Sequence, residues 1–376
     1  MTDIPWEITL ADVTIGDEER RAVDDVLRSG WLSMGPRTEV FEADFRAMLG
    51  GGHTVAVTNG TAALHLAAAA LGIGAGDEVI VPALTFVASA AAMRQAGASV
   101  RLADSTSLQD FNLAPDEIER LAGPRTRAIV VVHYAGYPAD MDAITSAAER
   151  HGLLVIEDAA HAVGASLSGR SCGNLGDAGC FSFFPNKNMT TGEGGMVVLR
   201  DPDIAARARA LRSHAMTTMT WDRHRGHASE YDVVEVGFNY RIDEMRAALG
   251  VEQLRRLPAA NARRAELSRL YARAIDEIDG IEYPTHGERG ESAHHLAVAV
   301  LESQDRRDAV RALLREHRIQ TSIHYPSINR FSSYTGGGSL PVAEAIADRS
   351  VTLPLHPGMR DEDVARVAEL LAEACL

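Results

Sequence analysis

Short apolar segments alternate with alanine-rich segments along the chain from about residue 55 to residue 250. The short segments are rich in β-branched residues and predict strands, whereas the alanine-rich segments, such as residues 61–72 and 140–152, have the apolar pattern of helices. This alternation predicts βαβ units, and therefore an α/β fold with a mainly parallel, doubly wound sheet. The predicted strands cover residues 54–58, 78–82, 99–104, 128–134, 153–158, 179–183 and 195–199.

The pattern changes near residue 250. Two arginine-rich helices are predicted at residues 241–257 and 261–278. Beyond them we predict an alternation of strands and helices with a glycine-rich loop at residues 335–339; the strands are 294–301 and 320–325, and the helices are 306–317 and 361–374. We therefore expect two domains: a large one over residues 1–250 and a smaller α+β domain over residues 251–376.

The chain of 376 residues is acidic, with a net charge of −15. A phosphate backbone is met by basic surface, so this charge argues against nucleic acid as a partner and still allows an anionic metabolite in a local pocket. We expect no membrane span, because the chain has no long uncharged apolar segment and does not start with a basic region followed by an apolar one. Three cysteines fit neither a disulfide framework nor a metal site, which indicates a cytoplasmic protein without metal: Cys172, Cys180 and Cys375.

Lysine occurs once in this sequence. The 37 basic residues are 36 arginines and Lys187, which lies beside a glycine-rich turn. Arginine keeps its proton in proteins, whereas a buried lysine amine can become neutral and attack a carbonyl carbon. A stray surface lysine is the simpler interpretation, but it does not explain the position. Lys187 is therefore our candidate for carbonyl chemistry.

Three other candidates also follow predicted strands. Gly60 and Thr61 open a helix, where free N–H groups and a hydroxyl form a phosphate site, although Thr61 as an ordinary N-cap is the simpler alternative. Asp158 ends an apolar strand, a position where an aspartate is also a common turn former. Phe86 follows another strand and is equally explained as a core residue. Ligands of open α/β sheets bind beyond these strand ends.

One cofactor requires all four features. Pyridoxal phosphate has an aldehyde for Lys187, a phosphate for the helix that begins near Gly60, and a ring for Phe86 to cover. Its pyridine nitrogen must stay protonated for the ring to withdraw electrons, and a neighbouring carboxylate such as Asp158 favours that state. The sequence therefore predicts a pyridoxal phosphate site.

The order of six motifs resembles the DegT/DnrJ/EryC1/StrS aminotransferases, which are fold type I pyridoxal phosphate enzymes. The motifs are WLSMGPRTEVFEADF, NGTAAL, PALTFVAS, EDAAHAVGA, FSFFPNKNMTTGEGGM and GFNYRIDEMRAALG. The resemblance implies an enzyme that transfers an amino group, usually from glutamate, to a keto sugar carried on a nucleoside diphosphate. It also implies a homodimer with shared active sites.

The resemblance assigns a role to each site residue. Lys187 would hold the cofactor and move protons, Asp158 would pair with the ring nitrogen, and His161 would lie near the phenolic oxygen. Phe86 would cover the ring. The phosphate would be held by Gly60, Thr61, Ala62 and Ser182, with Asn239 reaching across from the partner subunit; the sugar would face His324 and Tyr325.

Two departures from the family pattern affect this interpretation. Some relatives have histidine in place of Lys187 and dehydrate their sugar, so the lysine favours transamination. Ala215 stands where many relatives have glycine, in a long loop whose basic residues could meet the substrate diphosphate or could simply be solvated: Arg223, His224, Arg225 and His227.

The leading hypothesis is an aminotransferase that acts on a nucleotide-linked 4-keto-6-deoxy sugar. Three alternatives to it stay open. The substrate could be a 3-keto sugar or a cyclitol ketone, or the chain could be a cofactor-binding regulator without turnover. The complete set of Lys187, Asp158 and Thr61 argues against lost chemistry, and the sequence has no basic face for DNA.

Overall fold

The computed structural model describes residues 6–217, 230–334 and 338–375. Its main feature is a seven-stranded sheet in the order β1-β9-β8-β5-β4-β2-β3. Only β9 runs antiparallel to its neighbours, so the sheet is mainly parallel, as predicted. The strands are β1 (His53–Val57), β2 (Glu78–Pro82), β3 (Ser99–Ala103), β4 (Thr126–Val132), β5 (Leu154–Asp158), β8 (Ala178–Ser182) and β9 (Gly195–Leu199).

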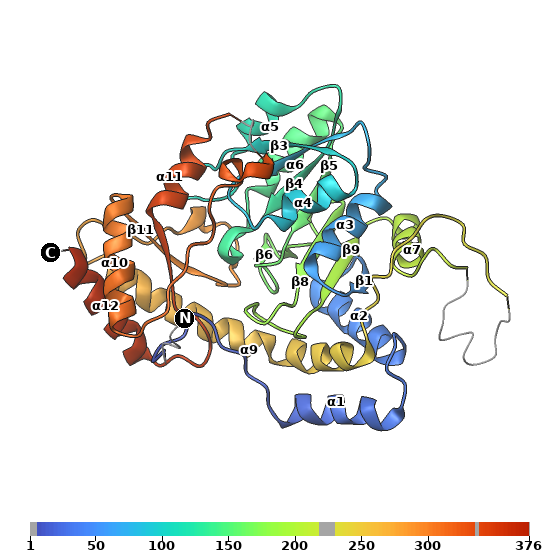
Figure 1. Ribbon diagram of the computed structural model, residues 1–376, viewed down its shortest axis with the longest axis horizontal. Helices are drawn as coiled ribbons and strands as arrows, with labels where there is room; N and C mark the ends of the chain where they lie inside the picture. The colour runs from blue at the N-terminus through green and yellow to red at the C-terminus, as the bar shows by residue number, and fades with distance from the viewer. Residues whose placement is uncertain (1–5, 218–229, 335–337, 376) are drawn as a thin grey trace.

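Helices cover both faces of this sheet (Figure 1). Alternate strand residues point to opposite faces, so Val55 and Val57 pack in one core and Ala56 in the other. The first face is covered by α3 (Gly60–Ala70), α4 (Ala88–Gln95) and α7 (Pro202–Leu211). The second is covered by α2 (Pro36–Leu49), α5 (Asp116–Leu121), α6 (Met141–His151) and the first half of α9 (Glu244–Ile275). The predicted doubly wound architecture is confirmed.

A second, three-stranded antiparallel sheet follows in the C-terminal part, in the order β10-β11-β12. Its core also contains the second half of α9 and the helices α10 and α12. These elements are β10 (Ile281–Glu282), β11 (Ala297–Leu301), β12 (Ser350–Leu353), α10 (Gln304–Glu316) and α12 (Asp361–Cys375). The helix α11 (Pro341–Arg349) instead packs against the first core of the large sheet. The smaller elements are α1 (Asp17–Ser29), β6 (Ser166–Leu167), β7 (Arg170–Ser171) and the short 3-10 turns Tyr134–Gly136, His286–Glu288, Ile328–Arg330 and Ser332–Tyr334.

The helix α9 corrects one prediction. The two helices expected at residues 241–257 and 261–278 are a single helix that continues through Pro258. Proline inside a helix costs about 3 kcal/mol because it removes an N–H donor and clashes with the preceding turn. Burial of apolar residues on both sides, such as Leu257 and Leu267, offsets this cost. The predicted domain boundary at residue 250 falls inside this helix and stays a prediction.

The prediction of a strand at residues 320–325 is wrong. Within the segment only Ser322 forms a bridge, to Thr352, and the preceding residue Ile319 forms another to Ile8. The alternation of its side chains is that of a strand, but no neighbouring strand continues the ladder. The segment instead brings His324 and Tyr325 to the end of the large sheet.

The long loop after α7 is described at its two ends only. The four basic residues predicted there, Arg223, His224, Arg225 and His227, lie outside the described residues. At its start, Ala215 has a φ of 52°, the left-handed region in which glycine is favoured. This conformation gives a physical reason for glycine at that position in relatives.

Candidate active site

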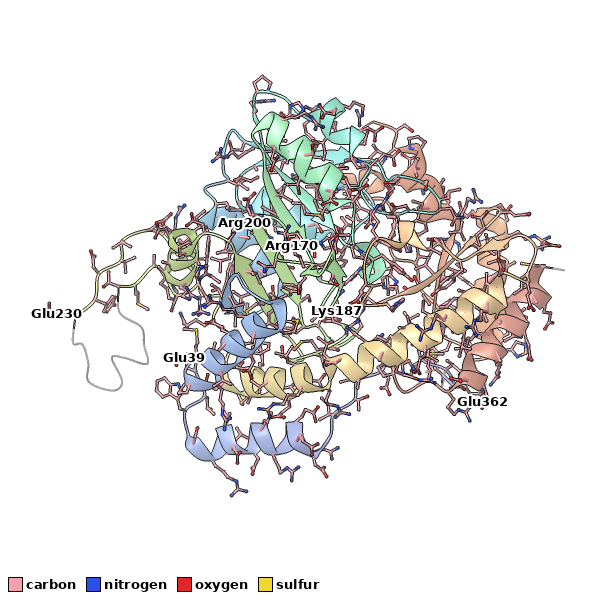
Figure 2. The ribbon with its side chains drawn as sticks, turned by 180° about the vertical axis from the view of Figure 1, so that it is seen from behind. Glu39, Arg170, Lys187, Arg200, Glu230 and Glu362 are labelled. Atoms are coloured by element: carbon pink, nitrogen blue, oxygen red, sulfur yellow. The ribbon has the colours of Figure 1, made fainter. Side chains whose placement is uncertain are left out.

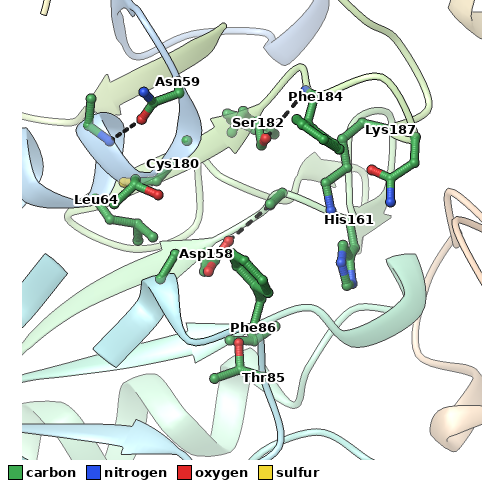
Figure 3. A pocket seen from close by; sticks show the side chains of 18 of the residues that line it. Asn59, Leu64, Thr85, Phe86, Asp158, His161, Cys180, Ser182, Phe184 and Lys187 are labelled. Carbon is green, nitrogen blue, oxygen red and sulfur yellow. Dashed lines mark hydrogen bonds between the residues drawn. The ribbon is translucent and has the colours of Figure 1, made fainter. Parts of the chain in front are cut away.

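A cavity of about 620 Å³ lies at the carboxyl ends of the parallel strands. These ends share one edge of the sheet, so residues from distant parts of the sequence meet there. Figure 3 shows Phe86, Asp158, His161 and Lys187 around this space. Nearly all of the predicted site residues line it: Gly60, Thr61, Ala62, Phe86, Asp158, His161, Ser182, Lys187, His324 and Tyr325.

Lys187 follows β8 in a tight turn, in which its backbone N–H donates to the carbonyl of Phe184. In Figure 2 it lies near the middle of the molecule, while Glu230 and Glu362 mark the periphery. Burial lowers the pKa of its amine to about 8, against the attraction of Asp158. A substantial fraction of the amine is therefore neutral near pH 8, as attack on a carbonyl carbon requires.

Asp158 ends β5 and is 6% exposed. Burial raises the pKa of its carboxyl group, whereas hydrogen bonds and the charge of Lys187 lower it. One carboxylate oxygen accepts from the Ser89 hydroxyl at 2.6 Å, and the other accepts from the backbone N–H of Ala160 at 3.2 Å. The carboxylate is held in one orientation at the cavity wall.

Ser89 was not predicted from the sequence. Its hydroxyl lies 2.8 Å from that of Thr85, so a chain of two hydroxyl groups leads to Asp158. The spacing of four residues, which puts both hydroxyls on one side of a helical turn, was the available signal. Its meaning depends on Asp158, which is 69 residues away.

His161 also lines the cavity. Its Nε2 is 2.9 Å from the hydroxyl of Tyr325, while its Nδ1 is buried and has no hydrogen-bond partner among the described residues. Burial, followed by the charges of Lys187 and His324, holds the pKa of His161 well below its usual range. The ring is therefore neutral at the wall of the cavity.

Phe86 and the two residues predicted to face the sugar, His324 and Tyr325, line the cavity. Phe86 is 55% exposed and lies 5.8 Å from the ring of Tyr325, so it is not a core residue. The backbone carbonyl of His324 accepts a hydrogen bond from the phenol of Tyr134, and its ring Nδ1 lies 2.9 Å from the Thr352 hydroxyl. Both predicted sugar-facing residues therefore lie at the cavity in fixed positions.

The start of α3 corrects the simpler interpretation of Thr61. The N-cap is Asn59, whose side chain accepts from the N–H of Ala62, so Thr61 does not cap the helix. The first amides of a helix have no partner within it, which leaves those of Gly60 and Thr61 for an anion. A Cβ on Gly60 would lie 2.8 Å from the Cβ of Ser182, so glycine permits this close approach.

Asn239 is exposed and does not line the cavity of its own chain. It also does not cap α9, because the side chain of Asp243 accepts from the N–H of Arg246 there. Its backbone forms a single bridge with Ser213. The predicted role of Asn239 across a subunit interface stays a prediction.

The site fits pyridoxal phosphate. The cavity has a lysine of lowered pKa, a buried carboxylate, a neutral histidine and the first two amides of α3. The described residues include no group of three histidine, cysteine or acidic side chains placed to hold a metal ion. Among the described helices, none is long and apolar enough to cross a membrane.

Comparisons with known proteins agree with this geometry. Residues 13–372 match the model of the DegT/DnrJ/EryC1/StrS aminotransferase family. The spore coat polysaccharide biosynthesis protein SpsC of Bacillus subtilis is 38% identical over 98% of this chain and 96% of its own.

Two solved structures are similar over almost the whole chain. The putative sugar aminotransferase Spr1654 of Streptococcus pneumoniae, in a PLP form, has a TM-score of 0.91, 28% identity and coverage of 99% of this chain and 98% of its own. DesI, solved with its TDP-sugar product, has a TM-score of 0.89, 32% identity and coverage of 99% and 93%. Motif order, cavity and comparisons lead to one conclusion: the chain belongs to the DegT/DnrJ/EryC1/StrS family and is a pyridoxal phosphate-dependent sugar aminotransferase.

Proposed function

We propose that this enzyme transfers an amino group from glutamate to the keto carbon of a nucleoside diphosphate 4-keto-6-deoxy sugar, as a step in deoxyamino sugar biosynthesis. The observation that carries the proposal is Lys187, a lysine of lowered pKa in the same cavity as Asp158. The TDP-sugar product of DesI supports a nucleotide-linked substrate.

Lys187 performs the proton transfers. Its Nζ would hold the cofactor at the aldehyde carbon until the amino donor takes that place. The freed amine would move the proton from the α-carbon of the donor to the cofactor, and in the second half of the reaction it would move a proton from the cofactor to the former keto carbon of the sugar. The bound cofactor supplies the ring that takes up the electron pair in both halves.

The other cavity residues hold the cofactor and tune it. Asp158 keeps a proton on the ring nitrogen through its negative charge, and Ser89 holds that carboxylate in place. The N-terminus of α3, with Thr61 and Ser182, binds the phosphate. Phe86 covers one face of the ring.

On the sugar side, His324 and Tyr325 come from the segment beside β12 and line the same cavity. Tyr325 also contacts His161, so a sugar bound there lies beside the ring that faces the cofactor. The two residues are therefore our candidates for substrate contacts.

We also propose a homodimer in which Asn239 completes the phosphate site of the partner subunit. Two observations support it: Asn239 is exposed in its own chain, and the segment before it contains exposed apolar side chains at Val233, Val234 and Val236. Exposed apolar patches of this kind mark protein–protein contacts.

Two experiments test the proposal. Borohydride reduction of the yellow holoenzyme, followed by peptide mapping, should find a pyridoxyl group on Lys187. Reduced protein in which Lys187 carries no such group would contradict the assignment. Incubation with glutamate and a panel of nucleoside diphosphate keto sugars, read by mass and NMR, should give a 4-amino product. A 3-amino sugar or an aminated cyclitol as the sole product would refute the 4-keto substrate.

A further inference from the structure

His295 lies directly behind His161. The two ring centroids are 4.3 Å apart with an interplanar angle of 37°, and the side chains are 4% and 5% exposed. His295 precedes β11 in the sequence, 134 positions after His161. No motif discussed above includes it, and it does not line the cofactor cavity.

A network of hydrogen bonds fixes the His295 ring. Its Nδ1 is 2.9 Å from the side-chain oxygen of Asn188, the residue after Lys187. The amide nitrogen of Asn188 donates to the carbonyl of Ala293 and to the side-chain oxygen of Asn261, at 2.7 Å and 2.8 Å. Asn188 therefore offers only its oxygen, so the Nδ1 of His295 carries the hydrogen and donates it.

Both histidines are neutral. Burial lowers the pKa of His295 well below its usual range, and the charges of Lys187 and Arg264 add to the effect. Two neutral rings can stack without charge repulsion. The stack then works as a packing contact between the loop of Lys187 and the ring of His161.

The position of His161 depends on two contacts. The Tyr325 hydroxyl lies 2.9 Å from Nε2, and the ring of His295 packs against that of His161 with centroids 4.3 Å apart. Nδ1 is the nitrogen that stays unpaired among the described residues. We infer that His295 is a positioning residue, whose ring holds the ring of His161 in place at the wall of the cofactor cavity.

The test uses the visible absorbance of the bound cofactor, which changes with the protonation of its link to the enzyme. The inference rests on the cofactor being held by Lys187, which peptide mapping tests separately. The absorbance measurement needs no sugar substrate. Replacement of His295 by Asn keeps an N–H donor for Asn188 and removes the ring face. We expect this variant to move the midpoint of the spectral pH titration by at least about 0.3 unit, which is a twofold change in the equilibrium.

A double variant distinguishes positioning from general damage. His161→Asn alone should also move the midpoint, and His161→Asn with His295→Asn should move it no further, because His295 acts only through His161. Additive shifts, or no shift in His295→Asn, would overturn the inference. An unchanged midpoint in His161→Asn would overturn it as well.

Two more variants control for folding and for the hydrogen bond. His295→Phe keeps a ring face on His161 and loses the donor to Asn188, so its midpoint should stay at the wild-type value; a shift equal to that of His295→Asn would refute the role of the ring. This outcome decides the question even if His295→Asn fails to fold. His294→Asn is the matched control, because His294 contacts Tyr137 instead, and its midpoint should not change.

Discussion

Removal of the Ser89 hydroxyl should shift the pH dependence of this enzyme. Ser89 donates a 2.6 Å hydrogen bond to the buried carboxylate of Asp158, and among the influences that lower the pKa of that carboxyl group this bond is the largest. Burial already raises the same pKa. In Ser89→Ala the lowering influence is lost and the burial stays, so the pKa of Asp158 rises further.

The structure sets the size of this shift. A hydrogen bond to a charged group is worth about 1.5–3 kcal/mol. One pKa unit corresponds to about 1.4 kcal/mol, so the pKa of Asp158 should rise by about 1–2 units. Turnover needs the ionised carboxylate, and the acidic limb of the kcat/KM profile should therefore move to higher pH by the same amount. Below this limb, the rate should fall about tenfold for each pH unit.

The assay is the pH profile of amine transfer, with cofactor occupancy read from absorbance at each pH. Thr85→Val is the matched control, because it removes the hydroxyl that touches Ser89 and leaves the bond from Ser89 to Asp158 in place. Its acidic limb should move much less. A fully occupied Ser89→Ala enzyme with an unmoved limb would refute the reasoning.

Three further outcomes are expected. Asp158→Asn should keep the cofactor and lose about 10²–10³ in kcat because the charge beside the ring nitrogen is gone, and near-normal turnover would show that the assignment is wrong. Glu157→Gln should lose about 3 kcal/mol of unfolding free energy in urea titrations, since this fully buried carboxylate accepts three backbone N–H groups, one of them from Gly173; a loss under about 1 kcal/mol would contradict this. If Asn239 acts across the interface, co-expression of Lys187→Ala and Asn239→Ala chains should give mixed dimers that are more active than either parent variant. If Asn239→Ala alone is impaired and the mixed dimers are no more active, Asn239 acts within its own chain.

Several features of the site could be read from the sequence because their signals are local. A single lysine among 37 basic residues and a carboxylate at the end of an apolar strand are visible without any contact. Parallel strands bring their carboxyl ends to one edge, so the meeting of Gly60, Phe86, Asp158 and Lys187 followed from their positions at the ends of predicted strands.

Predictions failed where a local preference competed with packing. Two helices were predicted where α9 is a single helix, because burial along the whole helix outweighs the local cost at Pro258. The pattern at residues 320–325 is that of a strand, but a ladder needs a neighbouring strand, and only single bridges form. Both the continuous helix and the missing strand depend on contacts with other segments as well as on the local sequence.

The sequence by itself determined the fold class and the chemical groups of the site, because periodicity and residue type express these directly. The tertiary structure alone decided which groups act together. Ser89 acquires a role through Asp158, and His295 through the face of His161, across 69 and 134 residues respectively. Such contacts have no signal in one sequence, because each depends on the packing of two segments that only the folded chain brings together.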